Sequence, residues 1–381
     1  MTRAYVTRTY LVPGRVELVG KHVDYAGGRS LTCAIGPALH VRATPLAEPV
    51  VTARDASRRE KVHVRLAADA KPGRVRWSAY VAAVARRFAR DFPHARTGVE
   101  IEMTSDLPAS AGLSSSSALV VAIATALVDA NAMERDDAWR AAVPDAVQRA
   151  EYFAAMETGA PYGPFAGDRG VGVRGGAQDH VAIVCAEEGS VGQFRYLPAR
   201  LERRVRWPAD LALVVAVSGV HATKTGNARD AYNRLADAMC ALGPGGSKFA
   251  SDPVMSARLG QFHQESDVIV PGVGDALRDR DYARIGELAD RSQSLAERVL
   301  GNQVPETIFL ARSARERGAI AASAFGAGFG GAVWAMVTRD AADAFAEGWR
   351  AAYGAAFPSR RASAQFIVTR PAGPAREVAG A

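Results

Sequence analysis

The run of small residues from Pro108 to Leu119, P-A-S-A-G-L-S-S-S-S-A-L, has the composition of an anion-binding loop. It leads into the apolar segment Val120 to Leu127, which favours a helix. Free backbone N–H groups and the helix dipole both attract a phosphate at a helix N-terminus, and the serine hydroxyls can bind it or reach its Mg2+. No G-K-[ST] follows, so this is not a Walker A loop. On this run alone, a serine-rich helix cap that binds nothing is an equal alternative.

A second polar loop, from Gly20 to Gly28, has the composition of a sugar-binding loop. Val16 and Leu18 alternate with polar residues as in a half-buried strand, which the glycine ends. Four hydrogen-bonding side chains then fall within five positions: Lys21, His22, Asp24 and Tyr25. Since a sugar hydroxyl both donates and accepts hydrogen bonds, this density suits a polyhydroxylated ligand. The alternative is a turn whose polar groups face water.

Two acidic residues could do chemistry near these loops. Glu151 lies among apolar neighbours in a helix expected over residues 137–156, where it is either a surface residue or a ligand for a hard divalent cation. Asp179 follows two glycines in V-R-G-G-A-Q-D-H and begins an apolar run. It could serve as a general base, and a helix-capping or turn aspartate is the equally common alternative.

The elements that position these residues divide into two lobes. A chain of 381 residues exceeds what one hydrophobic core usually serves, and we expect lobes at residues 1–205 and 206–381. A strand at residues 98–103 precedes the phosphate loop. A helix at residues 77–90 carries Trp77, which could line a pocket for a flat base. The glycine-rich segment Ala321 to Met336 allows close backbone approach before a strand, and the tail after Arg370 is expected to fray.

Composition excludes several classes of protein. The net charge of +7 comes from scattered arginines, and no block of basic residues with aromatics indicates nucleic-acid binding. There is no signal-like segment and no run of about 18 apolar residues, so neither export nor a membrane span is predicted. Three scattered cysteines fit a reducing compartment, and we expect a cytoplasmic protein.

Three glycine-rich segments, in this order, resemble the superfamily of galactokinase, homoserine kinase, mevalonate kinase and phosphomevalonate kinase, the GHMP kinases. P-G-R-V-E-L-V-G-K-H-V-D-Y-A-G-G is similar to the galactokinase sugar signature. A-G-L-S-S-S-S-A-L is similar to the shared phosphate loop, and S-A-F-G-A-G-F-G-G to the closing glycine motif. The resemblance runs from about Pro13 to Val337. It implies an α+β fold, with a ribosomal-S5-like mixed-sheet lobe, a ferredoxin-like lobe and the site in the cleft between them.

The resemblance also implies an ATP-dependent sugar kinase that uses Mg2+, and it assigns residue roles. The catalytic residues would be Arg15, beside the transferred phosphoryl group, and Asp179. The sugar would contact Glu17, Lys21, His22, Asp24, Tyr25, Gly176 and Tyr232. The nucleotide would lie against Trp77, Ser110, Ala111, Gly112, Leu113, Ser114, Ser115, Ser116 and Ser117. Ser116 and Glu151 would be associated with the magnesium ion.

The departures from the galactokinase pattern concern the substrate. Lys21 stands where galactokinases carry an acid that accepts a hydrogen bond from the sugar, and Glu17 stands where an asparagine is usual. A cation there would gain a charge-assisted hydrogen bond of about 1.5–3 kcal/mol from an acidic group. One hypothesis is therefore a sugar kinase, acting at the anomeric hydroxyl, whose substrate is an acidic or modified sugar. As the alternative for Lys21, the side chain points into solvent or pairs with Glu17.

Three other functions stay open at this stage. The protein could be an ordinary galactokinase, or a kinase of a non-sugar alcohol, although the H-V-D-Y segment favours a sugar. It could also be a catalytically silent sensor of sugar and ATP. Retention of Arg15, Ser116 and Asp179 argues against a silent sensor, because a binding module needs no base beside a phosphate site.

Overall fold

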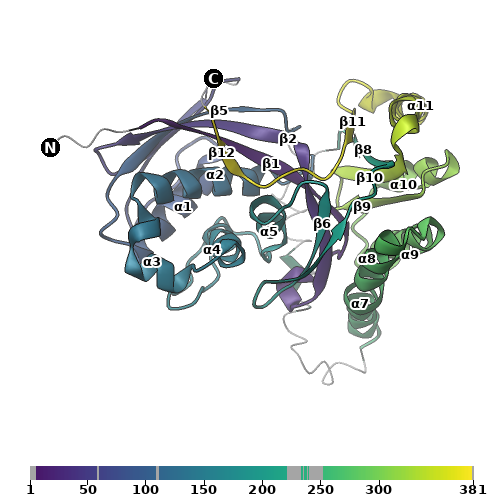
Figure 1. Cartoon of the computed structure of the whole chain (residues 1–381), viewed down its shortest axis with the longest axis horizontal. Coiled ribbons are helices and arrows are strands. Elements are labelled where there is room, and N and C mark those ends of the chain that lie inside the picture. The colour runs from purple at the N-terminus through teal and green to yellow at the C-terminus, as the bar shows by residue number, and fades with distance from the viewer. Residues whose placement is uncertain are drawn as a thin grey trace.

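The computed structural model describes residues 6–57, 60–108, 111–220, 233–234, 236–237, 239 and 252–379. The described part of the chain is built around two sheets that lie side by side, each with its own helices (Figure 1). The first is mixed, with strand order β12-β1-β2-β5-β3-β4, and β6 continues from β2 to β7. Its strands are β1 (Arg8–Val19), β2 (Arg29–Leu46), β3 (Val50–Asp55), β4 (Glu60–Arg65), β5 (Gly98–Ser105), β6 (Ser190–Arg195), β7 (Arg200–Arg206) and β12 (Arg376–Val378).

Helices cover one face of the first sheet (Figure 1). They are α1 (Ser78–Asp91), α2 (Ser115–Ala130), η2 (Met133–Arg135), α3 (Asp137–Ala142), α4 (Ala146–Thr158) and α5 (Gln178–Val184), and a short turn, η1 (Asp24–Ala26), follows β1. The central helix is α2, whose residues Ser117 to Ala124 are all buried. Its apolar residues lie on every side, as expected of a helix enclosed by other elements.

The second sheet has four antiparallel strands in the order β11-β8-β10-β9. These are β8 (Leu211–Val217), β9 (Ala321–Phe325), β10 (Ala332–Thr338) and β11 (Gln365–Thr369). The helical elements beside it are α7 (Pro253–His263), η4 (Gln264–Ile269), α8 (Val270–Asp279), α9 (Tyr282–Leu295), η5 (Ala296–Leu300), α10 (Pro305–Glu316), η6 (Arg339–Ala341), α11 (Ala342–Ala356) and η7 (Pro358–Arg360). Every residue of β8 is buried, since alternate side chains face two separate hydrophobic clusters; this explains its unbroken apolar sequence.

The two sheets share a continuous hydrophobic core. The main cluster contains residues of both, including Leu18 of β1 and Trp334 of β10. The Trp334 indole nitrogen also donates a hydrogen bond to the Leu18 carbonyl at 3.1 Å. The chain changes sheet between β7 and β8, close to residue 205. The division into lobes at that residue stays a prediction, because β12 returns from the far end of the chain to the first sheet.

The tail after Arg370 corrects the expectation of a frayed C-terminus. Three residues of β12 pair with β1, in the register Thr9 with Val378 and Leu11 with Arg376. An unpaired strand edge offers free backbone groups, and the tail satisfies them. Among the described residues, no helix is both long enough and apolar enough to cross a membrane.

Candidate active site

An ion pair between Arg15 and Asp179 joins the three glycine-rich motifs. Arg15 Nε lies 2.6 Å from Asp179 Oδ1, and its terminal Nη1 donates to the Gly112 carbonyl at 2.7 Å. The guanidinium also lies over the ring of Phe325, 5.6 Å from its centroid. The strand of the sugar signature, the phosphate loop, the start of α5 and the end of β9 therefore converge on one arginine, which is buried.

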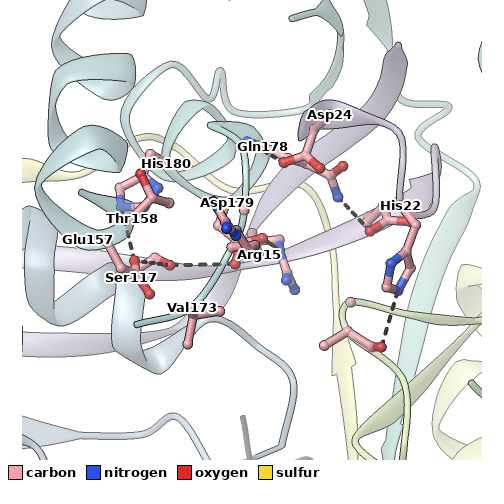
Figure 2. A pocket seen from close by; sticks show the side chains of 16 residues that line it. Arg15, His22, Asp24, Ser117, Glu157, Thr158, Val173, Gln178, Asp179 and His180 are labelled. Atoms are coloured by element: carbon pink, nitrogen blue, oxygen red, sulfur yellow. Dashed lines mark hydrogen bonds and ion pairs between the residues drawn. The ribbon is translucent and has the colours of Figure 1, made fainter. Parts of the chain in front are cut away.

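Two cavities meet at this pair. A larger one, of about 720 Å³, is lined by Trp77 and Tyr80 of the α1 region, by the phosphate loop and by glycines of the closing motif. A smaller one, of about 50 Å³, lies beside the loop from Gly20 to Gly28 and is drawn in Figure 2. Arg15 and Asp179 line both cavities. A group held in one cavity can thus reach a group held in the other across a carboxylate and a guanidinium.

Part of the nucleotide site that the sequence predicts lines the larger cavity. The backbone is left-handed at Gly112 and Ser114, with φ of 77° and 60°, which turns the chain into α2 at Ser115. The cavity is lined by Gly112, Ser114, Ser115 and Ser116. Ala111 and Leu113 instead point their side chains into the core. Trp77 lines the cavity with its indole nitrogen bonded to Glu60 at 2.7 Å, whereas Ser110 lies outside the described residues.

Ser117 and Glu157 lie beside Asp179, at the smaller cavity (Figure 2). Ser117 Oγ donates to Glu157 Oε2 at 2.9 Å and lies 3.5 Å from Asp179 Oδ2. Glu157 is buried and lines the smaller cavity, and His180 Nε2 lies 3.2 Å from the same Glu157 oxygen. Neither Glu157 nor His180 was predicted from the sequence as a site residue. Glu157 lies six positions beyond Glu151, nearer to Asp179 along the chain, and this spacing was the signal in the sequence.

The expected role of Glu151 needs correction. Its carboxylate accepts a hydrogen bond from the Ala199 backbone at 2.9 Å, and it lines neither cavity. Six residues along an α-helix turn the side chain by about 240°, so Glu151 and Glu157 cannot face the same way. Burial raises the pKa of Glu151, and the Ala199 hydrogen bond opposes that shift. Glu157, rather than Glu151, lies at the smaller cavity beside Ser117.

The donor set fits a magnesium ion that is bound mainly through a phosphate. Within the described ranges, no group of three or more His, Cys, Asp or Glu residues could by itself hold a metal ion. Ser117, Glu157 and Asp179 do bring hard oxygen atoms together at the junction of the cavities. Mg2+ typically takes one or two carboxylates and completes its shell with water and substrate phosphates.

His22 and Asp24, two of the predicted sugar contacts, line the smaller cavity. His22 has φ of 57°, and its Nδ1 lies 3.1 Å from the Tyr25 hydroxyl while its Nε2 lies 3.1 Å from the Ala327 carbonyl. Tyr25 therefore orients His22 and lines neither cavity itself. Gly176 packs so closely that a Cβ there would lie 2.5 Å from Asp24 Oδ2. Tyr232 lies outside the described residues.

Lys21 does not reach either cavity, which corrects the expectation of a substrate clamp. Its side chain is buried, and Nζ donates to Ser292 Oγ at 2.5 Å and Ser323 Oγ at 2.8 Å. Ser292 in turn donates to Glu265 at 2.7 Å. The lysine thus points neither into solvent nor into a pair with Glu17: it enters a polar network of the second sheet and its helices.

Glu17 lines the smaller cavity and is buried. Gln178, on the first turn of α5, donates to its Oε2, whereas Oε1 has no hydrogen-bond partner. Burial raises the pKa of Glu17 to about 7; Glu265 adds to the shift, and Lys21, Arg15 and Gln178 oppose it. Glu17 is among the sugar contacts that the sequence predicts, and that role stays a prediction.

Comparison with known proteins gives the family. The models for the GHMP kinases N terminal domain, the GHMP kinases C terminal domain and the galactokinase galactose-binding signature match residues 79–162, 275–355 and 5–45. A galactokinase of Mycobacterium tuberculosis is 31% identical over 353 residues, which cover 88% of this chain and 91% of that protein. A galactokinase of Mycobacterium bovis is 30% identical over the same span.

Solved structures agree on the fold. Lactococcus lactis galactokinase complexed with galactose superposes with a TM-score of 0.78 at 19% identity, over 98% of this chain and 95% of that one. L. major mevalonate kinase in complex with R-mevalonate gives 0.64 at 17% identity, over 98% of both chains.

The two lobes, the phosphate loop and the matching family models together define a kinase of small molecules, and the chain belongs to the GHMP kinase family. Within that family it is a galactokinase-like, ATP-dependent sugar kinase. The superfamily and the α+β fold predicted from the three motifs are thereby confirmed.

Proposed function

We propose that the protein transfers the γ-phosphoryl group of ATP to the anomeric hydroxyl of a neutral hexose, with galactose as the first candidate. The observation that supports this most directly is that Arg15 and Asp179 line both cavities. Nucleotide in the larger cavity and sugar in the smaller one would meet at this pair. The galactokinase signature over residues 5–45 supports the choice of sugar.

Phosphoryl transfer depends chiefly on positioning and on neutralising charge. The start of α2 would hold the ATP phosphates through backbone N–H groups and the hydroxyls of Ser115 and Ser116, which line that cavity. Arg15, fixed by Gly112, Asp179 and Phe325, would face the charge of the moving group. The Asp179 carboxylate would accept a hydrogen bond from the attacking hydroxyl, orient it and take its proton as the bond to phosphorus forms.

Mg2+ would be held by Ser117, Glu157 and phosphate oxygens, with Ser116 nearby on the phosphate side. Its chemistry would be to neutralise negative charge on the ATP phosphates.

The charges of the smaller cavity favour a neutral sugar. Its wall carries four carboxylates, those of Glu17, Asp24, Glu157 and Asp179. Of its two guanidinium groups, Arg15 pairs with Asp179, and Arg174 lies 2.9 Å from Asp237. With the Lys21 ammonium directed elsewhere, a uronic acid would bring another negative charge without an available clamp.

The test is ADP release by the purified protein with Mg-ATP and a sugar panel: galactose, other neutral hexoses, arabinose, glucuronate and galacturonate. We expect turnover with a neutral hexose and little with the acids. Turnover confined to the acids would contradict the proposed substrate class. Absence of turnover with every sugar, together with retained binding of sugar and ATP, would instead favour the silent sensor.

Asp179→Asn separates catalysis from binding. The amide keeps the size of the side chain but cannot take a proton, so we expect turnover to be lost while ATP affinity, measured by calorimetry, changes little. A mutant with near wild-type turnover would refute the role of Asp179.

A further inference from the structure

Glu17 is a buried carboxylate, and only one of its two oxygens accepts a hydrogen bond in the described structure. The residue is 2% exposed, on β1 two positions after Arg15. One oxygen accepts from Gln178, and the other is buried without a hydrogen-bond partner. A buried polar group without a partner is costly, so in a native protein it calls for an explanation such as a catalytic role or a bound partner.

The neighbouring cations do not supply the missing interaction. Arg15 is bonded to Asp179 and to the Gly112 carbonyl. The Lys21 ammonium is bonded to Ser292 and Ser323. The raised pKa of Glu17 agrees with this picture, because burial outweighs the combined effect of the two cations and Gln178. What the carboxylate lacks is a hydrogen-bond donor for its second oxygen, in a residue that lines the smaller cavity.

We infer that Glu17 determines sugar specificity: its carboxylate accepts a hydrogen bond from a hydroxyl of the neutral sugar in the smaller cavity and disfavours a sugar that carries a carboxylate. A sugar hydroxyl supplies the donor, whereas a uronate would bring like charge to an unpaired acid. The inference rests on the proposed function, since it concerns the substrate of that same site.

The position of Glu17 also links recognition to catalysis. Its partner Gln178 is the residue before Asp179 in the first turn of α5. A sugar bound by Glu17 would therefore be positioned relative to the helix turn that carries Asp179. The same backbone turn lies against Asp24, because the Gln178 N–H is 3.4 Å from Asp24 Oδ2. The first turn of α5 thus carries Asp179 and also contacts Glu17 and Asp24, the two acidic side chains proposed to bind the sugar.

The test is Glu17→Gln, assayed with galactose and with each monodeoxygalactose. The amide keeps the shape and can still accept from Gln178, but it then turns its NH2 toward the unpaired side. Since a hydrogen bond to a charged group is worth about 1.5–3 kcal/mol, we expect KM for galactose to rise about 10- to 100-fold. KM for ATP should not change. For one deoxy sugar, KM should be higher than for galactose in the wild type but not in the variant, because the variant has already lost the hydrogen bond that this hydroxyl makes. This comparison is a double-mutant cycle.

Galacturonate gives a second readout, because Glu17→Gln should improve its turnover relative to galactose. Glu17→Asp, which keeps the charge but withdraws the oxygen, should give an intermediate KM. It keeps the inference testable if the amide variant folds poorly. An unchanged galactose KM in both variants would overturn the role of Glu17. So would a cycle in which the effect of removing each sugar hydroxyl simply adds to the effect of the Glu17 substitution.

Failure of the proposed function is distinguishable from failure of this inference. If the wild type phosphorylates no sugar, the proposed function fails, and calorimetric binding of galactose to wild type and variant still tests Glu17. If the wild type is active and the variants bind sugar as tightly as it does, only the inference fails.

Discussion

Single residues decide what the site can do through the direction of their side chains. Arg15 and Glu17 lie two positions apart on β1, and both line the smaller cavity. The alternate residues Val16 and Leu18 pack into the core. The strand register is shifted between Pro13 and Arg15 and again between Glu17 and Val19. These irregularities flank the stretch that presents the two charged side chains to the smaller cavity.

The two glutamates of α4 give a matched pair for the metal. Glu157→Gln removes the carboxylate that contacts Ser117 near Asp179, and we expect kcat to fall by about 100-fold or more, as when one electrostatic contact to a phosphoryl group is lost. The apparent affinity for Mg2+ should fall as well, and a Mg2+ titration of ADP release measures both.

Glu151→Gln is the control, since this carboxylate lies on the same helix, accepts a hydrogen bond from the Ala199 backbone and lines neither cavity. It should leave the Mg2+ dependence unchanged. If Glu151→Gln impaired the Mg2+ response and Glu157→Gln did not, the original assignment from the sequence would be restored.

Glu17 also makes stability depend on pH. Its pKa is about 7 in the folded protein and about 4.3 in an unfolded chain, so the folded state holds the proton more tightly. The resulting stability is fully present below about pH 4.3 and is lost as pH rises through 7, by at most about 1.4 kcal/mol per pH unit. Glu17→Gln removes this loss. We expect its free energy of unfolding, relative to wild type, to be higher at pH 8 than at pH 5 in urea titrations. Parallel pH profiles would show that Glu17 is not a buried acid.

At the scale of elements, the proposed sugar contacts depend on the close packing of the turn before α5 against η1. A Cβ on Gly176 would lie 2.5 Å from Asp24 Oδ2 and 2.9 Å from the Asp24 carbonyl carbon. Gly176→Ala must therefore displace Asp24. We expect a sugar KM at least about tenfold higher with a nearly unchanged ATP KM, since about 1.4 kcal/mol corresponds to a factor of ten.

Gly260→Ala provides the comparison. Gly260 lies within α7, and its added Cβ would meet no atom within 4 Å. Alanine favours a helix over glycine by about 1 kcal/mol, so this variant should be slightly more stable and fully active. Equal sugar KM values for the two alanine variants would contradict the close packing of Gly176 on Asp24.

The motifs made most elements of the site predictable, but not the direction of every side chain. The loop before α2, the turn before α5 and the strand carrying Arg15 follow from glycine, serine and apolar patterns that act over a few residues. The targets of Lys21 are Ser292 and Ser323, about 270 and 300 residues away, so no local pattern shows them. Glu157 was not predicted because the choice between it and Glu151 depends on which of two side chains, six residues apart on α4, points toward the cavities. The pairing of β12 depends on a strand edge formed by the other end of the chain.

At the scale of the whole molecule, the hydrogen bonds around Lys21 hold the loop from Gly20 to Gly28 to the second sheet and its helices. The ammonium joins a loop after β1 to α9 and β9, and Glu265 of η4 accepts from the Gly20 and Lys21 backbone. The lysine is therefore expected to act on folding and on the alignment of the two sheets, rather than on the substrate directly.

Lys21→Met tests this placement. The variant keeps an apolar stem but leaves two buried serines and a nearby glutamate without the cation, at a cost of about 1–3 kcal/mol in unfolding free energy. Thermal and urea unfolding measure that loss. The folded fraction should retain the wild-type preference between galactose and galacturonate. A stable variant whose preference shifted toward galactose would instead indicate that Lys21 contacts the sugar.

The most direct test of the central claim is to identify the product that the purified protein forms from galactose and Mg-ATP, by phosphorus NMR. Phosphoryl transfer across the Arg15 and Asp179 pair to the anomeric oxygen predicts a sugar 1-phosphate formed in equal amount to ADP, and its absence with Asp179→Asn. A phosphate on another hydroxyl, or ADP released without phosphorylated sugar, would contradict the account.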